Sequence, residues 1–164
     1  MRSDPHTAST FGGVFAADTL PRVLHQMPAT IIVNFDPISK VGSHWVAISI
    51  DSHGNGEYFD SYGMPPVIAE HRQYLDRVCK KWRYNHVKLQ AFDSTVCGDY
   101  CLMYLIHKAH GYSLKQFARM YFNENVKRND AIVHYLMKRY SKKRRFCHDF
   151  IVRPNTQSCT SRKK

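Results

Sequence analysis

The feature that most constrains the fold is a pattern of strand, turn and strand in the first half of the chain. Residues 44–51 (HWVAISID) alternate between apolar and polar positions and are rich in β-branched residues, which is typical of a half-buried strand. The turn signal SHGNG follows at 52–56, and EYFDSYG at 57–63 resumes a strand pattern. ATIIVNFD at 29–36 is a continuous β-branched run and indicates a buried strand. We therefore expect a β-hairpin beside a buried strand.

Helical spacing begins after the hairpin. Beyond the Pro pair at 65 and 66, five positions recur at helical intervals: Val67, His71, Leu75, Val78 and Trp82. Residues 84–92 (YNHVKLQAF) return to a strand pattern, which Gln90 ends. The next helix is predicted from about Cys97 to the C-cap glycine Gly111.

Two more helices are predicted before the basic end of the chain. Ser113 and Gln116 have the spacing of a capping box for a helix that runs through about Phe122. Asn129 or Asp130 would cap another helix. The apolar face of that last helix would consist of Ile132, Val133, Leu136 and Tyr140.

Together these elements predict an α+β fold. A central mixed or antiparallel sheet would carry His44, Asp60 and Gln90 and would pack against a central helix that begins at Cys97. The length of 164 residues suits one domain with a hydrophobic core, because such a chain buries roughly 70% of the surface its unfolded form exposes. We divide the chain into a flexible N-terminal arm (1–10), a main domain (11–140) and a basic C-terminal tail (141–164).

Apolar runs and cysteine usage exclude several classes of protein. No run approaches the ~20 apolar residues of a bilayer span and no secretory signal follows Met1, so we expect no membrane partner. Five cysteines without a CxxC pair argue against a disulfide scaffold and favour a reducing, intracellular compartment. Zinc ligation by Cys97, Cys101, His107 and His110 is disfavoured, because the two pairs lie about two helical turns apart. We expect neither a metal nor an organic cofactor.

Most of the positive charge lies in the tail. The net charge is +11, and residues 141–164 hold eight Lys or Arg and one Asp, which is +7 of that total. Lys142, Lys143, Arg144 and Arg145 could contact DNA phosphates and release counterions. A solvated tail or a nuclear import signal explains the same residues equally well, because no aromatic residues interleave the basic ones.

Cys97 is a candidate nucleophile within STVCGDYC (94–101). A helix N-terminus and a nearby imidazolium lower a thiol pKa from ~8.5 toward a reactive value. Gly98 would leave room for a substrate backbone and for an amide N–H that faces a developing oxyanion. Cys101, one turn further on an apolar face, is expected to pack in the core. Packing is also the alternative for Cys97, since buried free cysteines are usually core residues.

His44 and Asp60 are candidate partners of this thiol. A carboxylate on the adjacent strand would fix the tautomer of His44, and a separation of sixteen residues is compatible with one sheet face. Taken alone, His44 could simply bond a backbone carbonyl, and Gln90 could face water. The order His44, Asp60, Gln90, Cys97 favours a catalytic set instead.

With these motifs, the chain resembles the adenain-type viral cysteine proteases, which are related to the SUMO-deconjugating proteases. It is most similar to those of large virus-like DNA transposons and related viruses. The resemblance covers residues 11–140 and implies an adenain-like, distantly papain-like fold. It rests on the segments GSHWVAISID, GEYFDSYG, LQ seven residues before the cysteine, and VCGDYC, supported by FGGVFAADTLP and NENVKRNDAIVHYL.

The resemblance implies a cysteine endopeptidase with named roles. Cys97 would be the nucleophile, His44 the general base and acid, and Asp60 the group that orients His44. Gln90 would donate to the oxyanion beside the Cys97 amide. Trp45 would flank a narrow cleft that admits glycine-containing cleavage sites.

Substrate, partners and location are likewise implied by the resemblance. The expected substrates are viral or transposon capsid precursors, the expected state is a monomer, and the expected location is the virion or host nucleus. DNA or an activating peptide could stimulate the enzyme. Adenain binds its peptide through a disulfide, and Cys79 lies in the corresponding region, although we expect it to pack. Asp60 stands where adenain has a glutamate.

Three alternative functions stay open. The chain could remove ubiquitin-like modifiers, or transfer acyl groups as bacterial acetyltransferases of the same clan do. It could also be a catalytically inactive, basic, DNA-associated structural protein. The compact size favours the capsid role, because modifier proteases need extra surface to hold a folded tag.

Overall fold

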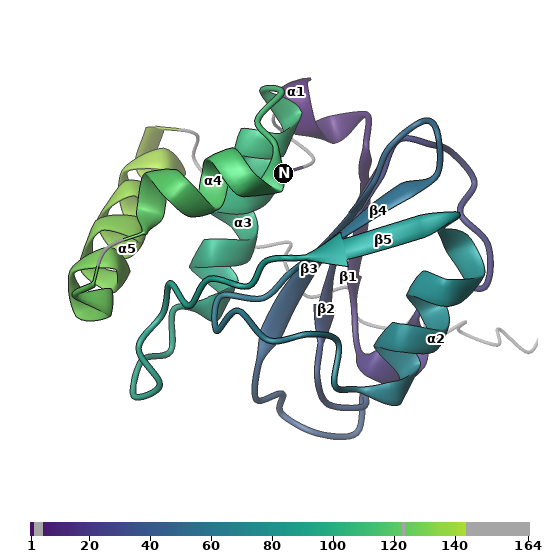
Figure 1. Ribbon diagram of the computed structural model, residues 1–164, viewed down its shortest axis with the longest axis horizontal. Coiled ribbons are helices and arrows are strands. Elements are labelled where there is room, and N and C mark those ends of the chain that lie inside the picture. The colour runs from purple at the N-terminus through teal and green to yellow at the C-terminus, as the bar shows by residue number, and fades with distance from the viewer. Residues whose placement is uncertain (2–4, 123, 144–164) are drawn as a thin grey trace, which may run out of the picture.

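The computed structural model describes residues 1, 5–122 and 124–143, and the predicted contacts of Arg144 and Arg145 lie outside this part of the chain. Figure 1 shows a central sheet with α2 on one side and α3, α4 and α5 on the other. The predicted α+β fold, with a mixed sheet packed on a helix that begins at Cys97, is confirmed.

Five strands form the sheet in the order β1-β2-β3-β4-β5. The outer pairs are parallel, β1 with β2 and β4 with β5, whereas the pairs β2 with β3 and β3 with β4 are antiparallel. The predicted hairpin is therefore present as β3 and β4. The strand bounds are β1 Phe11–Phe15, β2 Ala29–Asn34, β3 Trp45–Ile50, β4 Asn55–Phe59 and β5 Lys81–Tyr84.

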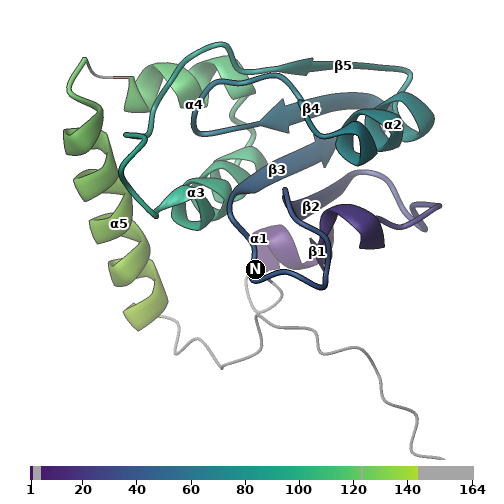
Figure 2. The same ribbon diagram turned by 90° about the horizontal axis from the view of Figure 1, so that it is seen from below.

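Helices cover both faces of the sheet and also precede it (Figure 2). The capping box predicted at Ser113 and Gln116 is present at the start of α4, where each side chain bonds the backbone or side chain of the other. The helix bounds are α1 Pro5–Ala8, the 3-10 helix η1 Ala17–Thr19, α2 Ala69–Val78, α3 Cys97–Ala109, α4 Leu114–Tyr121 and α5 Val126–Lys143.

Two predicted elements around β5 are wrong. Trp82 continues the helical spacing of α2 in the sequence, but α2 ends at Val78 because the next residues return to the sheet: Lys80 N donates to Gly54 O over 2.9 Å and Trp82 pairs with Gly56. The strand predicted at 84–92 ends at Tyr84, and residues 85–92 form a loop. Tertiary pairing thus outweighs local periodicity in both places.

The start and the inner face of α5 also differ from the prediction. The helix begins at Val126, so Asn129 and Asp130 lie inside it, buried, rather than capping it. Their side chains bond the loop before α3, which explains the polar burial. Of the predicted apolar face, Val133 is buried and Tyr140 packs against the core, as does Met137, whereas Ile132 and Leu136 are exposed.

The two ends of the described chain bear on the division at residues 10 and 140, which stays a prediction. Within the segment expected to be a flexible arm, α1 forms, Met1 is buried, and Thr7 Oγ1 donates to Met1 O over 2.6 Å. At the other end α5 continues past Tyr140 to Lys143. No helix in the described ranges is long and apolar enough to cross a membrane.

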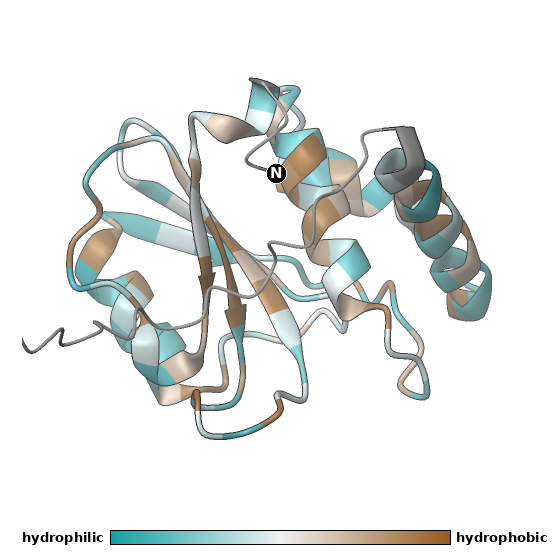
Figure 3. Cartoon of the chain, turned by 180° about the vertical axis from the view of Figure 1, so that it is seen from behind, coloured by the Kyte–Doolittle hydropathy of each residue, from teal (hydrophilic) through white to brown (hydrophobic). Residues whose placement is uncertain are grey.

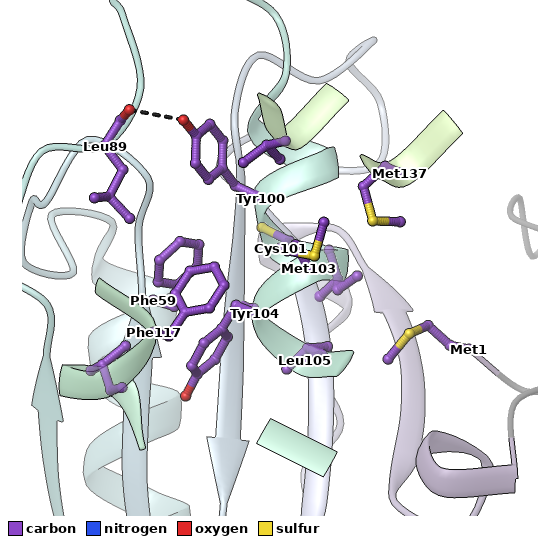
Figure 4. Packing of buried hydrophobic residues seen from close by; sticks show 14 residues of the cluster. Met1, Phe59, Leu89, Tyr100, Cys101, Met103, Tyr104, Leu105, Phe117 and Met137 are labelled. Carbon is purple, nitrogen blue, oxygen red and sulfur yellow. Dashed lines mark hydrogen bonds between the residues drawn. The ribbon is translucent and has the colours of Figure 1, made fainter. Parts of the chain in front are cut away.

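Two hydrophobic cores lie on opposite faces of the sheet. One is shared by α2 and the sheet face that carries Ile48 and Tyr58. The other is formed by α3, α4 and α5 with the face that carries Ala47 and Phe59, and Figure 4 shows its aromatic rings and Cys101 packed along α3. The hydropathy colouring in Figure 3 places the apolar residues on the central strands and α3. These two cores fix the position of β3, and therefore of His44, which directly precedes this strand.

A buried histidine makes the fold sensitive to acid. His71 is a buried residue of α2 that faces the sheet. Its Nε2 donates to Asn34 O over 3.0 Å, and its Nδ1 lies 3.2 Å from the Tyr58 hydroxyl. Burial lowers the pKa of His71 below its usual value of 6.5, outweighing the hydrogen bond to Asn34. Below about pH 6.5, His71 is protonated in the unfolded chain but stays neutral in the folded chain. The free energy of unfolding therefore falls as the pH falls.

We predict that the free energy of unfolding decreases between pH 7 and pH 5. In the variant His71→Gln, which keeps a donor and an acceptor but does not titrate, this decrease should be smaller. Urea unfolding at several pH values measures both slopes. Equal slopes for the two proteins would contradict a neutral, buried His71.

Candidate active site

Cys97 is the first residue of α3 and is buried. The first amide groups of a helix have no intrahelical acceptor and carry the positive end of its dipole, so they stabilise an anion at this position. Burial raises the pKa of the Cys97 thiol, but a hydrogen bond with His44 and the backbone amides of Trp45 and Gly98 together lower it below the ordinary value of a cysteine. The thiolate is thus favoured at this residue.

His44 precedes β3, and Asp60 follows β4, so the hairpin brings the two side chains together. His44 Nε2 lies 2.8 Å from Asp60 Oδ1, and both residues are buried. Burial lowers the pKa of His44, but the hydrogen bond with Asp60 and then that with Cys97 raise it to about 9. Since Nε2 is taken by Asp60, Nδ1 is the ring nitrogen left for the thiol.

Aromatic rings hold the imidazole of His44 from two sides. Tyr62 stacks on it with centroids 4.5 Å apart, and Phe35 meets it edge-on at 4.8 Å. Phe92, which is exposed, in turn contacts the Tyr62 ring. These contacts restrict rotation of the imidazole, which keeps it between the carboxylate and the thiol.

The side chain of Asn85 makes two hydrogen bonds with the backbone of Asp60. Asn85 Oδ1 accepts from Asp60 N over 2.9 Å and Asn85 Nδ2 donates to Asp60 O over 2.7 Å. This pair takes the place of a ladder where β5 has ended at Tyr84. Asp60 Oδ1 also accepts from Tyr62 N over 2.8 Å. The bonds to Asn85 fix the backbone of Asp60, and the bond from Tyr62 N fixes its carboxylate, which is 1% exposed and faces His44.

Gln90 lies in the loop between β5 and α3 rather than at a strand end, and its amide is fully buried. Its Oε1 accepts from Ser61 Oγ over 2.6 Å, and Nε2 lies 3.0 Å from both Ser94 O and Ser94 Oγ. The backbone N–H of Gln90 donates to Ser61 O. The structure therefore orients the amide firmly, but its hydrogen bonds within the described chain go to Ser61 and Ser94 rather than to Cys97.

A surface pocket of about 390 Å³ reaches Gly98, the residue that follows Cys97. Trp45 and Gly98, both predicted as cleft residues, line it. Trp45 also packs against the core of α3. A Cβ placed on Gly98 would meet no described atom within 4 Å, so the internal packing of the chain does not demand a glycine there. The remaining lining is largely apolar, with Val14, Ile32, Ile38, Val41 and Leu102 among the residues.

Neither Cys101 nor Cys79 is among the residues that line this pocket. Cys101 is fully buried in the core beside α3, and burial raises its pKa well above that of a free thiol. Cys79 is half-buried next to Gly56, and burial, with Asp51 and Asp76, raises its pKa to about 11. Lys142 and Lys143 are in the last turn of α5.

Several residues that surround the site are not evident from sequence patterns. Tyr62 stacks on the imidazole, and Asn85 and Ser61 hold Asp60 and Gln90. Ser61 directly follows Asp60, which is the only sequence signal that could have pointed to it. The others act across the fold and have no local pattern.

Comparisons with known proteins give limited similarity. No protein-family model and no curated protein matches the chain. Nine chains of solved structures match, among them crystal structures of the ASFV pS273R protease and of its Se-Met form. The first is 25% identical with a TM-score of 0.48 over 65% of this chain and 42% of the other. The second is 25% identical with a TM-score of 0.40, over 64% and 43%.

This chain therefore spans about two fifths of the length of those two structures. Both TM-scores lie below 0.5, so the function of this chain has to be inferred from its own site. That site has the parts of an activated thiol: a cysteine at a helix start, a buried histidine and a buried carboxylate.

We predict that Cys97 is the most reactive of the three described thiols. Near pH 7, iodoacetamide should label Cys97 at least about ten-fold faster than Cys79 or Cys101, because only its pKa is lowered. In His44→Ala, labelling of Cys97 should slow by about ten-fold or more, since the thiolate loses its imidazolium partner. Peptide mapping by mass spectrometry assigns the label. Equal labelling of Cys97 and Cys79 would contradict the prediction.

Proposed function

We propose that this chain is a cysteine endopeptidase with the triad Cys97, His44 and Asp60. The observation that carries the proposal is the His44 Nε2 to Asp60 Oδ1 hydrogen bond of 2.8 Å beside a thiol of lowered pKa at the start of α3. This arrangement favours the thiolate of Cys97, and the neighbouring residues Trp45 and Gly98 line a surface pocket. No other group of described side chains combines these features.

The first half of the proposed reaction forms an acyl-enzyme. The Cys97 thiolate attacks the carbonyl carbon of the scissile peptide bond and forms a tetrahedral intermediate. His44, as imidazolium, gives its proton to the departing amine nitrogen, and the carbon–nitrogen bond breaks to leave a thioester on Cys97. Asp60 stabilises the imidazolium and keeps Nε2 occupied, so Nδ1 is the nitrogen that moves the proton.

In the second half, water releases the acyl group. Neutral His44 takes a proton from water, whose oxygen attacks the thioester carbon. The carbon–sulfur bond then breaks to give the product acid and the Cys97 thiolate, and the imidazolium is restored for the next cycle. The raised pKa of His44, about 9, favours this resting ion pair.

Two donors are proposed for the oxyanion. The backbone N–H of Cys97 is among the first amides of α3, which have no intrahelical acceptor. Gln90 Nε2 is the second, as the family resemblance implies. In this structure Nε2 contacts Ser94 O and Ser94 Oγ, so in the proposed reaction the Ser94 side chain changes rotamer to free one amide hydrogen for the oxyanion. Each such donor is worth roughly 3 kcal/mol in the transition state.

The proposed substrate is an extended peptide with small residues at the cleavage site. Because packing does not require the glycine at position 98, the open space beside it is available to a substrate backbone. Glycine near the scissile bond would pass Trp45 most easily. By resemblance, we propose viral or transposon capsid precursors as the natural substrates, with the chain acting as a monomer in the virion or host nucleus.

The rival functions use the same thiol. Removal of ubiquitin-like modifiers and acyl transfer would both proceed through the thioester, and they differ only in what the cleft binds. Stimulation by DNA through the tail, or by a peptide at Cys79, remains a prediction. The pKa of about 11 disfavours Cys79 as a spontaneous disulfide partner. An inactive structural protein would not need the lowered pKa at Cys97.

We predict cleavage of peptides that contain glycine near the scissile bond. Cys97→Ala should abolish cleavage, and His44→Ala should lower kcat by about 10³-fold or more. Gln90→Ala should lower kcat by about 10²-fold if its amide meets the oxyanion. Cys79→Ala is the matched control and should retain wild-type rates. Chromatographic analysis of a peptide panel measures these effects, and an active Cys97→Ala protein would rule out the proposed nucleophile.

The pH profile of kcat/KM should be bell-shaped. Activity should rise as the pH passes the lowered pKa of Cys97, because the thiolate forms, and fall as the pH passes about 9, because His44 loses its proton. Asp60→Asn removes the strongest support of the imidazolium, so the alkaline limb should move to lower pH. An alkaline limb that stays in place in Asp60→Asn would show that Asp60 does not set the pKa of His44.

A further inference from the structure

The proton transfer proposed for His44 determines where the leaving part of a substrate lies. His44 gives its proton to the amine nitrogen of the residue that follows the scissile bond, so that residue lies next to the side chains around the imidazole. Two rings contact the imidazole. Phe35 packs against the core shared by α2 and the sheet, whereas Tyr62, which stacks on the imidazole, is half-buried and belongs to neither hydrophobic core.

Phe92 continues the ring of Tyr62 toward solvent. The two ring centroids lie 5.2 Å apart, and Phe92 is 72% exposed. Like Tyr62, it is absent from both hydrophobic cores of the described chain. A single exposed phenylalanine needs no explanation, but this one packs on the ring that covers the candidate catalytic imidazole. Exposed apolar surface at that place indicates a contact with a ligand.

The backbone holds both rings in fixed positions. Tyr62 lies in the turn 60–63, which a backbone hydrogen bond of 2.8 Å closes. Phe92 lies in the turn 91–94, which is closed in the same way over 3.2 Å. Ser61 O accepts two backbone N–H groups of the loop before α3, so the two turns are joined. A side chain that binds the rings therefore does not have to order them first.

We propose that Tyr62 and Phe92 form an aromatic surface that binds the side chain following the scissile bond, and that this surface favours an apolar, above all an aromatic, residue. The inference rests on the proposed peptidase function and names a class of substrate for it. Neither ring is among the residues that line the pocket of Trp45 and Gly98. That pocket is then left for the acyl part of the substrate, on the other side of the scissile bond.

The charges around the aromatic surface disfavour a basic residue. Lys88 Nζ lies 3.5 Å from the centroid of the Phe92 ring. His44, on which Tyr62 stacks, carries a positive charge in the resting site, because its pKa is raised to about 9. Both charges repel a Lys or Arg of the substrate. An acidic side chain would lose hydration against the rings, whereas an apolar ring buries surface and gains stacking contacts.

Phe92→Ala tests the aromatic surface with two peptides that differ only in the residue after the scissile bond, phenylalanine or glycine. For the wild type we expect kcat/KM to be about five-fold higher for the phenylalanine peptide. This ratio should fall to about one in Phe92→Ala and persist in Phe92→Tyr, which keeps the ring. Structural damage to the site would slow both peptides alike and leave the ratio in place. A wild-type ratio near one, or a ratio that Phe92→Ala does not change, would overturn the proposal.

The matched control is Phe122→Ala, which removes another exposed ring, at the end of α4. Phe122 is 59% exposed, and its removal should leave the wild-type ratio unchanged. Two further peptides test the effect of charge, with lysine or glutamate after the scissile bond. Both should be cleaved more slowly than the phenylalanine peptide. A preference for glutamate that persists in Phe92→Ala would assign the selectivity to Lys88 and overturn the role of the rings.

A binding measurement separates this inference from the proposed function. In the Cys97→Ala background, where no reaction can occur, the Kd of the phenylalanine peptide should be about five-fold lower than that of the glycine peptide. Adding Phe92→Ala should remove this difference. If wild-type protein cleaves neither peptide, the peptidase function is rejected whatever the two Kd values are. If it cleaves them but the two Kd values are equal, only the aromatic surface is rejected.

Discussion

The hydrogen bond between His44 Nε2 and Asp60 Oδ1 connects the sheet to the chemistry of the site. It spans the ends of β3 and β4, so it depends on the hairpin register that the two hydrophobic cores maintain. The same bond offsets the cost of burying the imidazole, raises its pKa to about 9, and leaves the other ring nitrogen for Cys97. Without the carboxylate, a histidine buried at this point would be neutral, as His71 is, and would provide no counter-ion for a thiolate.

The loop between β5 and α3 is ordered by side chains instead of a strand ladder. Asn85 holds Asp60, and Ser61 holds Gln90 through both its hydroxyl and its carbonyl. From the other side, Asp130 in α5 accepts from Ala91 N and from the Tyr100 hydroxyl. Each of these hydrogen bonds satisfies a buried polar group, while Asp60 Oδ2 has no partner among the described residues. The end of β4, the loop and α5 are thereby joined into one support for the residues around Cys97.

Three thiols in this chain show how environment decides reactivity. Cys101 is one helical turn beyond Cys97 but lies in the core, and burial raises its pKa well above the usual value. Cys79 is half-buried near two carboxylates, and its pKa rises to about 11. Only Cys97 combines the start of a helix, an imidazole and backbone amides, and its pKa is lowered in spite of burial. The lowered pKa is a property of the position and not of the residue type.

Local periodicity and turn residues predicted the hairpin and the helix that begins at Cys97. The strand spacing was compatible with a contact between His44 and Asp60, which the structure contains. Contacts across the fold were needed to show that 85–92 is a loop and that Asn129 and Asp130 lie inside α5. The same contacts bury Asn34 Nδ2 without an acceptor among the described residues. These features depend on which buried polar groups find partners across the fold, and that is settled by residues distant in the chain rather than by neighbours.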